Sequence, residues 1–104
     1  MENWKGREEQ DMQIILTPCE SLIMRCVWQP DIGEFFTAEE VIDKVYEIYR
    51  RRWTTTNGTA FLDRLRKKGL VGRKRKGFRK YYYCKMTLEE ARDAGIKERR
   101  NGWF

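Results

Sequence analysis

The first run of apolar residues at helical spacing begins directly after a helix-start signal. Thr17 is a hydroxyl N-cap, Pro18 occupies the first helical position, and Glu20 completes a T-x-x-E capping box. The apolar stripe that follows consists of Cys19, Leu22, Ile23, Cys26 and Val27, widened by Met24 and Trp28. The pattern predicts a helix that ends before Pro30 and is followed by a loop over residues 30–36.

Two more helices are indicated in the same way. A second capping box, formed by Thr37 and Glu40, precedes a buried face made of Ala38, Val41, Ile42, Val45 and Tyr49. A third helix begins at Thr54 or Thr55 and is closed by Gly69, the residue type favoured after a helix C-terminus. Its inward positions are Phe61, Leu62 and Leu65, and small polar residues crowd its first turn.

Beyond Gly69 the pattern changes from helix to strand. Residues 70–74 and 79–86 fit two strands separated by a turn at Lys76-Gly77, and three consecutive tyrosines supply aromatic strand formers. Another capping box, Thr87 with Glu90, opens a last helix that runs to about Ile96. The remainder, from residue 97, is a basic tail.

Three helices followed by a β-hairpin are typical of a winged helix-turn-helix, which is mostly α with a small β-hairpin and so belongs to the α+β class. We expect three parts: an N-terminal arm over residues 1–15, the winged-helix domain over residues 16–86, and a C-terminal helix and tail over residues 87–104. The chain contains no internal repeat and no low-complexity segment.

Charge is distributed very unevenly along the chain. Residues 1–49 hold four basic and eleven acidic side chains, whereas residues 50–80 hold thirteen basic side chains and one acidic one, Asp63. A net charge of +12 within 31 residues indicates a polyanionic partner. The arginines in the segment favour phosphate and base recognition, because the guanidinium group binds both in a bidentate manner. The alternative interpretation is a solvated basic face.

The predicted third helix suits the major groove of double-stranded DNA, which admits one helix and exposes base edges to its first turn. Candidate base contacts are therefore Thr54, Thr55, Thr56, Asn57 and Thr59. Candidate phosphate contacts are Arg64 and Arg66 to Lys68 further along the helix, and Lys74, Arg75, Lys76 and Arg79 around the tip of the hairpin. The threonines would also serve as simple N-caps, and the tyrosines are better explained by packing of the hairpin on the helices than by stacking on bases.

Other chemistry is not indicated. The chain has three cysteines, no Cys-x-x-Cys and no histidine, so neither a metal site nor another cofactor is expected, and Cys19 and Cys26 are interpreted as buried reduced thiols. Catalytic motifs such as a P-loop or G-x-S-x-G are absent, and the acidic pairs in first helical turns suit the helix dipole, so we expect no enzyme. Without a signal peptide or an apolar run of membrane-spanning length, we expect a cytoplasmic protein with no membrane partner.

Two separated motifs resemble those of the penicillinase and methicillin-resistance repressors (BlaI/MecI/CopY). Leu16-Thr17, Glu20, Ile23-Met24 and Val27-Trp28 are similar to that family's L-T-x-x-E-x-x-I-M-x-x-V-W opening. The stretch TTTNGTAFLDRLRKKGLV after Trp53 looks like its recognition helix, Gly77 with the tyrosines like its wing, and residues 87–90 like the start of its next helix. The resemblance covers about residues 16–90. It implies base contacts at Thr55, Thr56, Asn57, Thr59 and Arg64, and wing contacts near Arg75 and Lys76.

The same resemblance implies a homodimer on a pseudo-palindromic operator. Family members usually form the dimer through further helices, and few residues follow Thr87, so we expect the arm and the last helix to form the interface. Unexplained apolar residues at the two ends favour this, unless they fold back on their own domain; they are Trp4, Ile14, Ile15, Ile96, Trp103 and Phe104. The tail has no cysteine cluster of the kind that senses copper. Gly58 stands where the family tends to place Val or Ile, which predicts a softer helix start and a lost core contact.

The leading hypothesis is a sequence-specific transcriptional repressor that binds double-stranded DNA. A second hypothesis is a winged-helix accessory protein of a mobile element or replication system, which places another protein on DNA. A third is a winged helix whose basic face binds an acidic protein. The threonine-rich first turn of the third helix favours the two DNA-binding hypotheses.

Overall fold

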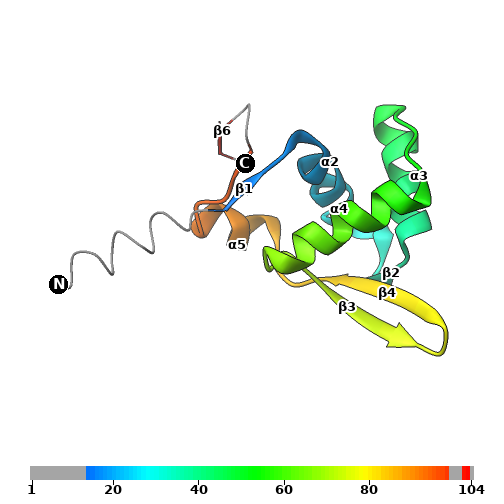
Figure 1. The fold of residues 1–104 in the computed structure, drawn as a ribbon. Helices are drawn as coiled ribbons and strands as arrows, with labels where there is room; N and C mark the ends of the chain where they lie inside the picture. The colour runs from blue at the N-terminus through cyan, green and yellow to red at the C-terminus, as the bar shows by residue number, and fades with distance from the viewer. Residues whose placement is uncertain (1–13, 99–101, 104) are drawn as a thin grey trace.

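Four α-helices and two small sheets form the part of the chain that the computed structural model describes, residues 14–98 and 102–103 (Figure 1). The helices are α2 (Pro18–Val27), α3 (Ala38–Tyr49), α4 (Thr55–Lys67) and α5 (Leu88–Asp93). The wing is a hairpin of β3 (Val71–Lys76) and β4 (Arg79–Cys84), which projects beyond the helices. The architecture confirms the predicted α+β winged helix.

The capping boxes form as the sequence predicts. Thr17, Thr37 and Thr87 each accept a hydrogen bond from the backbone of the glutamate three residues later, and each glutamate accepts one from its threonine's N–H. Thr54 caps α4 by accepting from the N–H of Asn57 at 3.1 Å. Each helix is therefore started by local side-chain chemistry, independently of packing.

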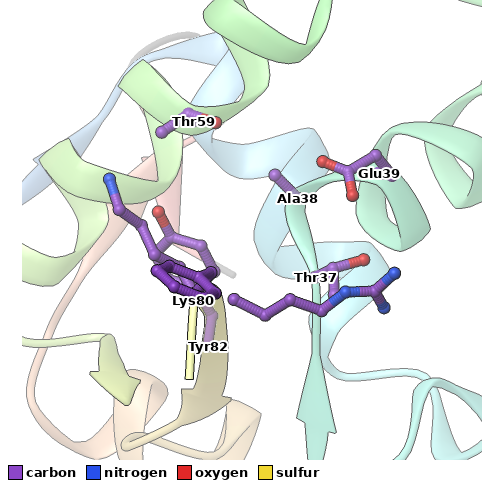
Figure 2. A pocket seen from close by; sticks show the side chains of 8 residues that line it. Thr37, Ala38, Glu39, Thr59, Lys80 and Tyr82 are labelled. Carbon is purple, nitrogen blue, oxygen red and sulfur yellow. The ribbon is translucent and has the colours of Figure 1, made fainter. Parts of the chain in front are cut away.

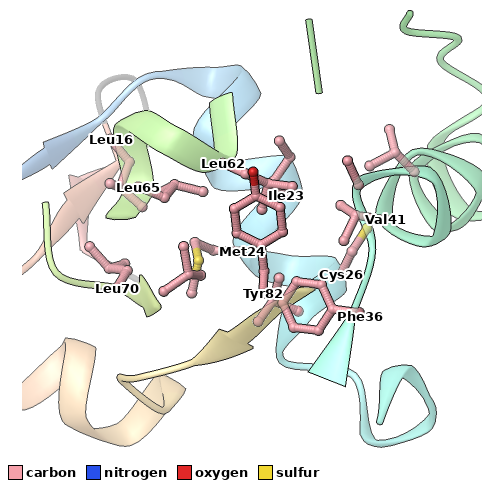
Figure 3. Packing of buried hydrophobic residues seen from close by; sticks show 14 of the residues in the cluster. Leu16, Ile23, Met24, Cys26, Phe36, Val41, Leu62, Leu65, Leu70 and Tyr82 are labelled. Atoms are coloured by element: carbon pink, nitrogen blue, oxygen red, sulfur yellow. The ribbon is translucent and has the colours of Figure 1, made fainter. Parts of the chain in front are cut away.

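The core lies where α2, α3 and α4 meet the wing (Figure 3). Ile23 and Met24 from α2, Val41 from α3 and Leu62 from α4 are completely buried there. Tyr82 of β4 is buried in the same cluster, as the packing interpretation of the tyrosines requires. Its neighbours Tyr81 and Tyr83 are half-buried on the opposite face of the strand.

The predicted loop over residues 30–36 is wrong in its second half. It contains a short 3-10 helix, η1 (Pro30–Ile32), and then a strand, β2 (Phe35–Phe36), which pairs antiparallel with β4. The wing sheet thus has three strands in the order β2-β4-β3. Buried Phe36 lies opposite Tyr82, so packing against the tyrosine holds a strand too short to show a sequence period.

A second sheet joins the two ends of the described chain. Its strands are β1 (Ile15–Leu16), β5 (Lys97–Glu98) and β6 (Gly102–Trp103), with β1 parallel to β5 and β5 antiparallel to β6. The last helix therefore ends at Asp93 and not near Ile96, because Gly95 turns the chain at a φ of +75°. The strands β5 and β6 take up residues 97–98 and 102–103 of the expected tail.

This sheet changes the interpretation of the apolar ends. Ile96 is buried and Ile14 is half-buried against the core, so both fold back on their own domain. Ile15 is exposed, with 46% of its surface accessible to solvent. Trp4 and Phe104 lie outside the described residues.

Candidate nucleic-acid interface

A solvent-facing stripe runs the length of α4. Thr56, Ala60, Arg64 and Lys67 are exposed at spacings of four, four and three residues, which places them on one face of the helix. Thr54, Thr55 and Asn57 are exposed at its N-terminus, and Thr59 is half-buried. The predicted base-contact residues thus gather at one end of an open helix face, and Ala60 leaves room beside them for a close approach.

Gly58 occupies the opposite, inner face of this helix and is buried. A Cβ atom built there would lie 2.6 Å from Cδ1 and 2.7 Å from Cγ1 of Ile42 in α3. The expected lost core contact is therefore wrong: the missing side chain lets α3 and α4 approach each other, and Ile42 fills the space. The glycine fixes how α4 sits on the domain.

Lys68 does not join the exposed stripe. Its Nζ donates to Oε1 of buried Glu20 at 2.6 Å and to the backbone carbonyl of Ile15 at 3.1 Å. Burial alone would raise the pKa of Glu20, but the bonds from Lys68 and from the N–H of Thr17 outweigh it and hold the pKa below 4.5. Lys68 thus ties α4 to α2 and β1, whereas Lys67 is the cation that faces solvent.

The register of the wing sorts its cations onto two faces. Arg73 lies opposite buried Tyr82, and Arg75 lies opposite Lys80, so these cations share the face turned towards the helices. By register the predicted contacts Lys74, Lys76 and Arg79 belong to the other face, but Arg79, next to the turn, also lines the space between the wing and the helices. The four wing residues expected to bind DNA therefore do not form one patch, and Lys80, absent from that expectation, joins Arg75.

Like charges lie directly opposite one another near the wing tip. Arg75 pairs with Lys80, and Lys76 pairs with Arg79. Such pairs destabilise an antiparallel ladder. No acidic side chain occurs between residues 71 and 86 to relieve them. The tip therefore carries a repulsion that a polyanion would remove.

Asp63 holds the base of the wing to α4. Its Oδ1 accepts a hydrogen bond from the Tyr82 hydroxyl at 3.3 Å and lies 3.7 Å from Nη1 of Arg73. Burial, and then the charge and hydrogen bond of Asp63, raise the pKa of Tyr82. The single acid of the basic segment therefore positions the wing relative to the helix.

A hollow of about 300 Å³ separates the wing tip from the helices (Figure 2). Thr59 of α4, the N-terminal residues Thr37 to Glu39 of α3, and Lys80 and Tyr82 of β4 line it, together with Phe78 and Arg79 at the tip. Figure 2 shows Thr59 and Lys80 bordering the same hollow from the helix and from the wing. A phosphate backbone would meet the hydroxyl of Thr59 and the cations Arg79 and Lys80 there, with the carboxylate of Glu39 also at the border.

The outer face of the wing is aromatic as well as basic. The ring of Phe35 makes an edge contact with Tyr83 at 5.8 Å between centroids, and Nζ of Lys74 lies 5.5 Å from the Phe35 centroid. Gly72 allows this packing, because a Cβ there would come within 2.2 Å of the Tyr83 ring. Sequence reasoning did not find this face, since β2 was not predicted.

Three arginines, residues 50–52, follow the end of α3 and precede α4. Arg52 stacks over the Tyr46 ring at 4.3 Å, and Arg50, at 5.6 Å from the same ring, adopts a left-handed φ of 58° as the C-cap. All three, including Arg51, are exposed. They extend the positive surface beyond the N-terminus of α4.

The thiols differ in their surroundings. Cys26 is buried, which raises its pKa to about 11, but Cys19 is only half-buried, contrary to expectation, and Cys84 is exposed. Within residues 14–98 and 102–103 no three metal-ligating side chains cluster. No helix of this described part is long and apolar enough to cross a membrane.

Comparison with known proteins adds one match. A family model described as penicillinase repressor matches residues 16–102, which include α2 to α5, the wing, strand β5 and the first residue of β6. No curated protein matches the chain.

Proposed function

Because the chain belongs to the penicillinase repressor family, whose proteins are DNA-binding transcriptional repressors and not enzymes, we propose that it represses transcription by binding a specific sequence of double-stranded DNA. The observation that carries this proposal is the wing tip, where like charges face each other across the ladder, beside a helix whose open face ends in small polar side chains. The first feature favours a polyanion, and the second favours contact with base edges.

The proposal assigns base contacts and phosphate contacts to different sets of residues. Thr55, Thr56 and Asn57 at the start of α4 meet base edges, with Thr54 and Thr59 beside them. Arg64 and Lys67 follow the phosphate backbone along α4, and the phosphate contacts of the wing come from Lys74, Arg75, Lys76, Arg79 and Lys80. Lys68 holds the fold together through Glu20 and is not assigned to DNA.

We also propose that the protein acts as a homodimer on a pseudo-palindromic operator, as members of the family typically dimerise. Ile15 supports an interface near the N-terminal arm, because it is a large apolar side chain exposed on the edge strand β1. The six-residue helix α5 contributes little apolar surface, since its outward positions are mainly charged. The interface therefore involves the arm and β1 more than α5.

Selection of bound sequences from random duplex DNA tests the proposal directly. We expect one enriched motif, present as two inverted halves if the dimer binds. With roughly 6–10 phosphate contacts, affinity for the selected duplex should fall about 10³–10⁵-fold between 50 and 200 mM salt. The selected sequence placed in a reporter promoter should lower transcription when the protein is present.

Two variants separate the roles of helix and wing. Asn57→Ala should relax the selected motif, since a good base contact is worth about 1–3 kcal/mol. Arg75→Ala should weaken all duplexes alike and lower the salt slope by about one unit. Binding without any sequence preference, and without repression of the reporter, contradicts the repressor and favours an accessory protein that coats or bridges DNA.

A further inference from the structure

Phe78 is a fully exposed phenylalanine at the tip of the wing. The other large apolar side chains on the described surface keep at least half of their area covered; they are Ile15, Phe35, Tyr46 and Ile48. A ring with no cover is unfavourable in water, and the residues next to it, Gly77 and Arg79, offer no apolar side chain. Neither the core nor the wing sheet accounts for it.

The turn presents this ring at the far end of the hairpin. Lys76 pairs with Arg79, which leaves Gly77 and Phe78 as a two-residue loop, and only Gly77 has a positive φ, +64°. Glycine at the first central position is the pattern of a type II′ turn, which keeps two strands in tight register. Phe78 is therefore held on a rigid, narrow tip.

The positive charge around the Phe78 ring indicates the kind of site that the ring would enter. Residues 73–80 contain six cations and no acid, and all eight are exposed. The minor groove is a narrow slot, and its negative potential is strongest where it is narrowest. A basic hairpin tip suits such a groove, and Phe is among the side chains that proteins insert there between base steps.

We propose that Phe78 enters the minor groove beside the α4 contact and wedges between two base pairs, partly unstacking and bending the duplex. This rests on the proposed DNA binding and adds a second source of sequence preference. Pyrimidine–purine steps unstack most easily, so the wing would select such a step without hydrogen bonds to its bases. Lys76 and Arg79, which flank the turn, lie where phosphates on either side of the step would pass.

The hollow lined by Thr59, Lys80 and Phe78 indicates where the Phe78 wedge would act relative to the base pairs covered by α4. It lies between α4 and the wing tip, so one strand of the duplex would run through it while α4 occupies the major groove on one side and Phe78 the minor groove on the other. The step that is read therefore lies immediately outside the base pairs that α4 covers.

Duplexes carrying 2-aminopurine at successive positions of the selected operator test the proposal with the full-length protein. We expect the wild type to raise the fluorescence of the probe at one step outside the α4 footprint and to shorten the end-to-end distance of a doubly labelled duplex. Phe78→Ala should lose both signals and bind about tenfold more weakly. Lys76→Ala, the matched variant at the same turn, should keep both signals and lower the salt slope by about one unit.

The outcomes distinguish a failure of the Phe78 wedge from a failure of the proposed DNA-binding function. If the wild type binds no duplex in preference to others, the proposed function falls and this inference falls with it. If the wild type binds specifically but Phe78→Ala leaves fluorescence and bending unchanged, only the wedge is overturned. Phe78-dependent binding to anionic lipid vesicles, with DNA binding unaltered, also overturns the wedge and assigns the ring to a membrane surface. Since Phe78 contacts no core residue, thermal unfolding of the variant should match that of the wild type.

Discussion

Gly58 shows how a single missing side chain can position a helix, here the helix to which we assign the base contacts. In an exposed helix a glycine costs about 1 kcal/mol relative to alanine. Here the cost is offset, because the space of the absent Cβ is occupied by the end of Ile42. The two residues should therefore behave as a coupled pair.

We expect Gly58→Ala to destabilise the wild type by about 1 kcal/mol, since the added methyl group overlaps Ile42 and outweighs the gain in helix propensity. In an Ile42→Ala background the same change should instead stabilise by about 0.5–1 kcal/mol, because only the propensity remains. Urea unfolding of the four proteins measures this coupling. A stabilising effect of equal size in both backgrounds would show that the close packing of α3 on α4 has no energetic consequence.

Glu20 is a buried charge whose loss should be visible in the pH dependence of stability. Its pKa is lower in the folded protein than its ordinary value of 4.5, so it contributes stability above pH 4.5. That contribution is lost as the pH falls below 4.5 through the pKa of the folded state. We expect Glu20→Gln to lose about 1–3 kcal/mol at neutral pH, because Lys68 is left without its carboxylate, and to have a flatter stability curve below pH 4.5.

Glu39→Gln is the matched control for this experiment. Glu39 also lies in the first turn of a helix, but it is exposed, so its replacement should change stability by less than about 0.5 kcal/mol. Denaturant unfolding between roughly pH 3 and pH 7 compares the two. Identical curves for both variants would mean that the pair of Glu20 with Lys68 does not stabilise the fold.

At the scale of the element, two adjacent lysines at the C-terminus of α4 have different roles. Lys67 continues the open stripe of Arg64, whereas Lys68 turns back to Glu20 and β1. We expect Lys67→Ala to leave stability unchanged within about 0.5 kcal/mol and to lower the salt slope of DNA binding by about one unit. Lys68→Ala should instead destabilise the fold by about 1–3 kcal/mol, since Glu20 stays buried without its partner.

Salt titrations of DNA binding and denaturant unfolding of both variants test the roles assigned to the two lysines. If Lys68→Ala leaves the fold intact and reduces the salt slope as much as Lys67→Ala does, the assignment of the two lysines is wrong.

The elements with local start signals were predictable, and those held only by distant partners were not. The threonine–glutamate boxes located α2, α3 and α5, and Thr54 with Gly69 bracketed α4. Strands of two residues, such as β2 and β5, have no period to detect and exist because Phe36 meets Tyr82 and Lys97 meets Ile15. Such contacts join residues more than forty positions apart.

Most residues of the candidate site were predictable from the sequence, but the face of the helix or wing on which each one lies was less so. Lys68 lies three residues after buried Leu65, so the helical period already placed it on the inner face, and Lys67 should have been preferred. In the wing the strands were predicted, but their pairing depends on the turn at Gly77-Phe78. A turn one residue later than expected decides which cations share a face.

At the scale of the whole molecule, the basic surface and the ends of the domain are separate regions. The tip of the wing and the start of α4 lie towards one side of the molecule in Figure 1, and the sheet of β1, β5 and β6 lies towards the other. A salt bridge of 2.6 Å between Arg25 and buried Glu98 fastens that sheet to α2. The dimer contact proposed at Ile15 would therefore leave the proposed DNA-binding surface free.

Sedimentation at micromolar concentration should show a dimer or a concentration-dependent mixture. We expect Ile15→Glu to shift it to monomer and to weaken binding to two inverted half-sites more than to one, because a charge replaces an exposed apolar side chain at the interface. Ile48→Glu is the matched control, since Ile48 is exposed to a similar extent, 43%, on α3. A strict monomer at every concentration, or an equal effect of both variants, would remove β1 from the interface.

The alternation of the wing also restricts how its length can vary among related proteins. Inserting one residue into each strand between the base and the tip would move every cation beyond that point to the opposite face, so Arg75 and Lys80 would turn away from the helices. Inserting two residues into each strand would restore the original faces and only extend the reach. Hairpins of this kind should therefore differ in length by four residues at a time, and a designer lengthening the wing should follow the same step.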